Sequence, residues 1–184
     1  MRRLSLILTF ILVLLMSTTL SAQADLALTR LDEDVDYAVQ WMQLLYNRVE
    51  GESRNVPQAA RIYAYAGVTL YLALMPTMTQ PVLDIAQLND LPPLPEADPA
   101  LDYDGLSIVN GALSTVIPGL MAPLENRGTI TTTNNFNTAE SNGTRRAVSA
   151  VSGRQYGERR REVDGATVDR SVAYGEQLGQ AILE

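Results

Sequence analysis

The sequence predicts an all-α fold, a partial helical bundle of about four long helices with a long proline-rich loop and a Thr/Asn-rich insertion. Apolar residues recur three and four positions apart in four separate stretches, which is the period of an amphipathic helix. No stretch alternates apolar and polar residues for the length of a paired strand, and residues 130–133 form one short β-prone run without a partner. Six of the nine prolines fall between residues 76 and 105, outside the periodic stretches.

The first 24 residues read as a secretory signal peptide. A short basic start precedes an apolar run at residues 4–16, and Ala22-Gln23-Ala24 supplies the small residues found before a cleavage site. The apolar run is shorter than the roughly 20 residues of a membrane span. We therefore expect cleavage after Ala24 rather than an uncleaved anchor. The product is one helical N-terminal domain, residues 25–184, in an exported protein, either periplasmic or extracellular.

The first two predicted helices cover residues 34–50 and 57–74. The first has a broad apolar stripe around Trp41, and acidic residues crowd its start, where the helix dipole favours negative charge. The second is apolar nearly all round, and between Ala59 and Met75 its only strongly polar side chain is Arg61, so we expect it in the middle of a bundle. A cation buried there needs a carboxylate. Arg61 is therefore predicted to form a buried structural ion pair, with a ligand contact as the alternative.

The middle of the chain alternates loops and helices. Residues 76–105 should wrap the surface as a proline-rich loop with one short helix at 81–88. The third helix covers residues 106–120, and Pro118 should kink or end it. Residues 129–144 hold few large apolar groups to offset the entropy cost of ordering, so we expect a mobile insertion. Residues 145–162 are polar and predicted to be weakly helical.

The last predicted helix covers residues 167–183. Gly175 and Gly179 lie on its apolar face and permit close contact with another helix. The apolar pattern runs to the final residues without a cap, a glycine or a proline. We therefore expect the domain to be truncated before a catalytic bundle in the complete protein.

Composition limits the chemistry available to the chain. It has no cysteine and no histidine, and its 14 basic residues are all arginine. Disulfides, thiolate nucleophiles and thiolate zinc sites are excluded, and the commonest general base is missing. The formal net charge is −7 and becomes more negative by two on signal cleavage, which disfavours nucleic acid and anionic membranes. We predict no catalytic, cofactor-binding or metal-binding residue in this chain.

Three charged clusters are candidates for calcium or phosphate sites. The acidic residues at 32–36 suit helix capping better than calcium. Residues 102–105 faintly resemble a calcium loop, but the first ligand position would be Ala100 and the closing glutamate is replaced by Gly111. The arginines at 145, 146, 154 and 159–161 suit a solvated helix face better than a phosphate site, because Glu158 and Glu162 interleave with them.

Five segments, in this order, resemble the N-terminal helical region of bacterial vanadium-dependent haloperoxidases and type 2 phosphatidic acid phosphatases. Together they span roughly residues 34–184. They are the helix around Trp41, the apolar stretch at 57–73, the proline-rich stretch at 88–95, Val109-Asn110-Gly111-Ala112-Leu113 and its continuation to residue 116, and the helix at 168–182.

The resemblance implies a scaffold for phosphoester hydrolysis or vanadate-dependent halide oxidation in the complete family member. That family holds phosphate or vanadate with a lysine followed by Arg-Pro, a Ser-Gly-His, and an arginine with a later histidine, all C-terminal to the matching region. This chain has no lysine, no histidine and no Arg-Pro, and its Ser152-Gly153-Arg154 carries arginine in the histidine's place. We expect the chain alone to be inactive, with vanadate bound only in a complete family member.

Two hypotheses about function follow. In the first, the chain is a scaffold whose catalytic half is supplied in cis or in trans. In the second, it is a stand-alone, non-catalytic exported module that binds a protein partner through an uncovered helix face. A third, a carboxylate-based enzyme, needs paired acids in one cleft, which the sequence does not indicate. The residues do not separate a phosphatase from a haloperoxidase.

Overall fold

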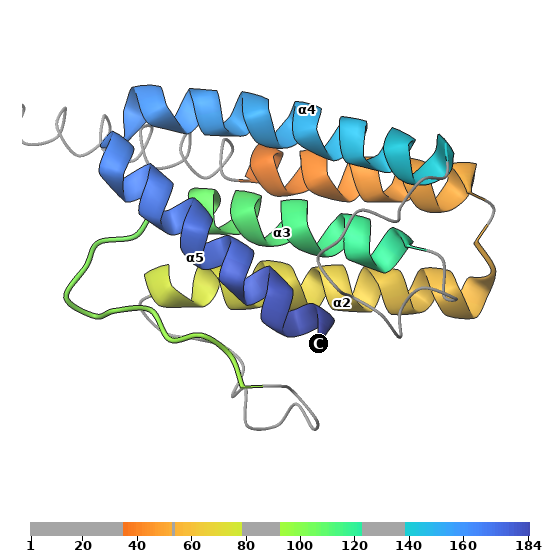
Figure 1. The fold of residues 1–184 in the computed structure, drawn as a ribbon, viewed down its shortest axis with the longest axis horizontal. Helices are drawn as coiled ribbons and strands as arrows, with labels where there is room; N and C mark the ends of the chain where they lie inside the picture. Colours follow the sequence, from red (N-terminus) through yellow and green to blue (C-terminus); the bar gives the residue numbers. More distant parts are fainter. Residues whose placement is uncertain (1–34, 53, 79–92, 123–138) are drawn as a thin grey trace, which may run out of the picture. The chain divides into compact units, whose positions relative to one another are not determined.

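The computed structural model describes residues 35–52, 54–78, 93–122 and 139–184 (Figure 1). Within these ranges every regular element is a helix, which confirms the all-α prediction. The predicted signal peptide, the short helix expected at 81–88 and residues 129–138 lie outside the described residues. The helices are residues 35–51, α2 (Val56–Leu74), the 3₁₀ turn η1 (Met75–Thr77), α3 (Gly105–Met121), α4 (Ala139–Glu162) and α5 (Gly165–Leu183).

The central helix of the compact unit Ala38–Glu184 is α3. It packs against α2, α4 and α5, and Figure 1 shows it between α4 and α2 with α5 crossing it. Most of its side chains are buried, and its apolar ones meet Trp41, Leu45 and Leu178 in one core. Pro118 lies inside α3, which continues for three residues and ends at Met121. The helix therefore ends within a turn of this proline, as expected from the loss of its backbone N–H and from the steric conflict of its ring with the preceding turn.

Three glycines bring the backbones of α3 and α5 into direct contact. A Cβ atom placed on Gly111 would lie 2.2 Å from the carbonyl oxygen of Val172, and one on Gly175 would lie 2.2 Å from that of Ile108. A Cβ on Gly179 would lie 2.8 Å from the carbonyl oxygen of Ala112. No larger residue fits this spacing. The expectation that the glycines of the last helix permit close packing is confirmed.

The prediction for α4 needs correction. This helix has 24 residues, whereas its first part was expected to be a mobile insertion and the rest only weakly helical. Thr144 is buried and its hydroxyl bonds Glu52 Oε1 at 3.2 Å, while Arg48 Nη2 donates to the carbonyl oxygen of Gly143 at 3.1 Å. Polar contacts of this kind anchor the start of α4 where apolar side chains are scarce.

The position of α2 was also predicted wrongly. Its buried side chains, among them Ile62, Ala66 and Thr69, share one face, and this face packs on α3. The opposite face is exposed, so α3 rather than α2 occupies the middle. Arg61 lies on that opposite face and is exposed, and the predicted burial of its side chain is not found. An exposed guanidinium remains hydrated and needs no carboxylate.

Residues 93–104 run along α5 and lead into α3. The Tyr174 hydroxyl donates to the carbonyl oxygen of Pro95 at 3.1 Å, and the rings of Tyr103 and Tyr174 are 5.4 Å apart. The Arg170 guanidinium lies 5.6 Å from the centre of the Tyr103 ring and donates to the carbonyl oxygen of Asp102. These contacts fix the segment that carries Asp104.

Candidate functional site

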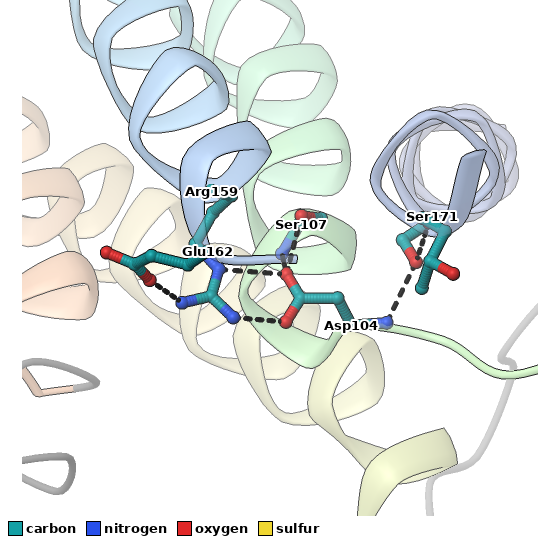
Figure 2. Close-up of polar contacts among 6 residues, drawn as sticks. Asp104, Ser107, Arg159, Glu162 and Ser171 are labelled. Carbon is teal, nitrogen blue, oxygen red and sulfur yellow. Dashed lines mark hydrogen bonds and ion pairs between the residues drawn. The ribbon is translucent and has the colours of Figure 1, made fainter. Parts of the chain in front are cut away.

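A partly buried ion-pair network joins α3 to the end of α4 (Figure 2). Arg159 on α4 donates from Nη2 to Asp104 Oδ1 at 2.5 Å and from Nε to Asp104 Oδ2 at 3.1 Å. Its third nitrogen, Nη1, donates to Glu162 Oε2 at 2.5 Å. A two-pronged arginine–carboxylate contact is both strong and specific in geometry. The guanidinium therefore faces carboxylates on two sides.

The same aspartate caps α3 and touches α5. Asp104 Oδ2 accepts from the Ser107 N–H at 3.0 Å and from the Ser107 hydroxyl at 2.6 Å, which satisfies orphan donors of the first turn. The Asp104 N–H donates to Ser171 Oγ at 2.9 Å, and this hydroxyl donates in turn to the carbonyl oxygen of Thr167 at 2.7 Å. One residue thus links three helices.

The surroundings of Asp104 favour its ionised form. The side chains of Asp104 and Arg159 are only 11% and 16% exposed. Burial alone would raise the pKa of Asp104, but the hydrogen bonds from Arg159 and Ser107 outweigh it, and the pKa lies below the usual value of 3.8. The carboxylate is therefore charged at neutral pH.

This network has the properties of a structural cluster rather than of a catalytic site. An aspartate with a lowered pKa is a weak general base at neutral pH. The Ser107 hydroxyl already donates to that aspartate, and the chain has no histidine to activate it as a nucleophile. All three guanidinium nitrogens of Arg159 donate hydrogen bonds to Asp104 or Glu162. What the cluster can do is hold α3, α4 and α5 in register.

A second polar cluster lies between the 35–51 helix and α4. The Trp41 indole donates to Gln155 Oε1 at 2.8 Å, and both side chains are fully buried. Gln40 Oε1 accepts from Gln155 Nε2 at 3.3 Å and from Arg154 Nη2 at 2.7 Å. The cluster gives the buried indole and amide the partners that they need in an apolar interior.

The buried side chain of Asn110 on α3 is only partly hydrogen-bonded. Its Nδ2 donates to the carbonyl oxygen of Ser152 at 3.0 Å, whereas its Oδ1 has no partner among the described residues. A buried acceptor without a donor costs about 1–3 kcal/mol. Ser152, in the Ser152-Gly153-Arg154 segment noted in the sequence, thus accepts this hydrogen bond through its backbone carbonyl. Arg154 of the same segment donates a hydrogen bond to Gln40.

The described residues hold no metal site. No three or more aspartate, glutamate, histidine or cysteine side chains in these ranges gather closely enough to bind an ion. Asp104, within the stretch 102–105, forms an ion pair with Arg159. The acidic residues at 32–34 lie outside the described ranges.

The most conspicuous surface is the outward face of α2. Val56, Tyr63 and Tyr65 are 82%, 37% and 42% exposed. The exposed residues Ala60 and Ala64 lie on the same face, together with Gly67, where an added Cβ would meet open space. We call these residues and Arg61 the α2 face. Among these exposed residues Arg61 is the only charged one.

Sequence reasoning missed the Asp104–Arg159 pair. Arg159 was assigned to a solvated helix face, but only Arg160 and Arg161 of that run are exposed. A signal for half of the pair exists, since an aspartate three residues before a serine and just ahead of an apolar helix is typical of an N-cap. Nothing in the local sequence links that cap to an arginine 55 positions later.

No protein-family model, no curated protein and no solved structure matches this chain. The fold and the polar clusters therefore define the class on their own: an all-α helical unit whose charged network is structural. In the part of the chain that the structure describes, no helix is long and apolar enough to cross a membrane.

Proposed function

We propose that this chain is an exported, non-catalytic helical scaffold. It corresponds to the N-terminal helical part of a haloperoxidase-like or acid-phosphatase-like protein, and the remaining helices of such a protein pack on the α2 face. The observation that carries the proposal is the exposure of that face. Ala60, Ala64 and Gly67 make it flat, and Tyr63 and Tyr65 flank the flat strip.

The composition of the α2 face suits helix packing better than solvent. A helix exposed to water normally carries charged side chains on its outer face, whereas this face has one, Arg61. Contiguous exposed apolar surface marks an interaction site or an aggregation hazard. Small side chains let a second helix approach closely, as Gly111 and Gly175 do inside this protein.

The absent residue types support a scaffold rather than an enzyme. Histidine, lysine and cysteine do not occur in the chain, and Asp104, Ser107 and Arg159 are engaged with one another. In the resembling family, lysine, arginine and histidine neutralise or attack the oxyanion. Phosphate or vanadate would therefore be held by residues on the helices that this scaffold receives.

Site-specific photo-crosslinking tests the proposal in the source cell. A benzoylphenylalanine at Ala64 should crosslink to helical polypeptide carrying the Lys…Arg-Pro, Ser-Gly-His and Arg…His elements, identified by mass spectrometry. The matched control is the same probe at Ala173, an exposed alanine on α5. It should not give this product.

Two outcomes would contradict the proposal. A crosslinked polypeptide without those elements would favour the alternative, a stand-alone module that binds a protein partner. A crosslink to a second copy of this chain would make the α2 face a self-association surface. Repeating the experiment with Ala64→Glu in a crosslinker variant at Ala60 separates specific packing from random collision, because only specific packing is sensitive to the new charge.

A further inference from the structure

A row of three arginines runs along the outer face of α4. Arg146, Arg154 and Arg161 are all exposed. They are eight and then seven residues apart, which is close to two helical turns in each case. At 100° per residue, the three side chains leave the helix within an arc of about 80°. This arc lies opposite the buried Val148 and Gln155.

Arg146, Arg154 and Arg161 form no salt bridge with a carboxylate of the described residues. Arg154 bonds the neutral amide of Gln40, and neither Arg146 nor Arg161 forms an ion pair within the described ranges. Glu158 is half-buried beside the row, and Glu162 bonds Arg159. The arc of about 80° that holds the three arginines thus carries no acidic residue, in a protein whose formal net charge is −7.

Between the arginines the exposed face of α4 carries only small residues. Ala150 and Gly153 are exposed, and Cβ atoms added to Gly153 or Gly157 would meet nothing within 4 Å. A mid-helix glycine costs roughly 1 kcal/mol relative to alanine, and internal packing does not explain this cost here as it does at Gly175. These small residues leave room for a partner to approach the α4 backbone between the cationic side chains.

We propose that the outer face of α4 binds an acidic helix of a partner protein. The arginines are about 12 Å and about 10 Å apart along the axis. Carboxylates repeated every seven or eight residues along a partner helix have the same spacing, so each can meet one guanidinium. Nucleic acid and anionic membranes fit less well, because the rest of this acidic protein repels extended polyanions.

Binding of defined probes to the full-length mature chain tests the inference. The main probe is an alanine-based helical peptide whose glutamates repeat the eight-then-seven spacing. The comparison probe has the same composition with its glutamates moved to other faces. Isothermal titration should show that the spaced peptide binds at least about tenfold more tightly, and that added salt weakens it.

Charge variants assign the binding to α4. Arg161→Glu should weaken binding of the spaced peptide by about fivefold, and Arg146→Glu with Arg161→Glu by about 25-fold. Arg61→Glu is the matched control, since it makes the same charge change at an exposed arginine on α2 and should change binding less than twofold. Gly153→Leu adds bulk without charge and should weaken binding, whereas Ala173→Leu on α5 should not. Circular dichroism verifies that each variant remains folded.

Four results would overturn the inference. The first is equal binding of the spaced and rearranged peptides, and the second is no binding of either peptide. The third is binding of duplex DNA or phosphatidylserine vesicles through the same arginines while the spaced peptide does not bind. Equal losses in Arg61→Glu and Arg161→Glu would likewise show a response to net charge rather than to this face.

Discussion

Alanine substitutions at Gly175 and Gly157 should have opposite effects on stability. Both glycines lie inside helices, α5 and α4, so alanine gains about 0.8–1 kcal/mol of helix propensity at either position. At Gly157 the new Cβ meets open space. Gly157→Ala should therefore stabilise the protein by about 0.8 kcal/mol and raise the melting temperature by about 2 °C.

At Gly175 the new Cβ would lie 2.2 Å from the Ile108 carbonyl oxygen and 2.9 Å from the Ala112 backbone nitrogen. Since C–H···O contacts settle at roughly 3.3 Å, α3 and α5 must separate by about 1 Å. Overpacking of this kind costs about 3 kcal/mol, which the propensity gain reduces to about 2 kcal/mol net. The melting temperature should fall by about 4–8 °C.

Thermal and urea denaturation of the two variants beside the parent chain provide the assay. Gly111→Ala is a second test of the same contact from the α3 side, because its Cβ would lie 2.2 Å from the Val172 carbonyl oxygen. If Gly175→Ala is as stable as Gly157→Ala, the two helices do not touch through their backbones, and the account of the core is refuted.

Three further predictions concern charge, processing and activity. Asp104→Asn should lower the free energy of unfolding by about 2 kcal/mol, because it removes the charge that Arg159 binds. Since the folded-state pKa of Asp104 lies below its ordinary value of 3.8, the parent pair contributes fully above that pH and loses its contribution as the pH falls through the folded-state pKa. Urea midpoints at neutral pH and near pH 3 should therefore fall less with acid in Asp104→Asn than in the parent, and an equal decrease would contradict the assignment. N-terminal sequencing of exported protein should begin at Asp25, and an intact Met1 in a membrane fraction would reject cleavage. Purified chain should neither hydrolyse a phosphomonoester nor, with vanadate and peroxide, brominate a halide-acceptor dye, and activity that survives repurification would disprove this.

Apolar periodicity located the helices that carry most of the core. The predicted ranges 57–74, 106–120 and 167–183 differ by at most two residues from α2, α3 and α5 at either end. These helices bury uniformly apolar faces, and Gly175 and Gly179 stood out because they interrupt such a face. Sequence periodicity is reliable where burial and apolarity coincide.

Periodicity failed where the buried stripe is polar. Thr144, Val148 and Gln155 face the core of the unit from α4, and only one of the three is apolar. Their hydrogen-bond partners, including Trp41 and Glu52, are about 90 or more positions away, so a local pattern cannot reveal them. The error at Arg61 has the converse cause, because an apolar helix was assumed to be covered on all sides.

The contact between α3 and α5 also sets a constraint on the order of folding. The two helices begin about 60 residues apart in the chain, so their interface is a non-local one that requires closure of a long loop. At a synthesis rate of about 5–20 residues per second, roughly 3–12 s pass between the completion of α3 and the completion of α5. For that interval the groove at Gly111 that α5 fills, with Ile108 and Ala112 beside it, is open. A nascent chain at this stage is a natural client for a chaperone.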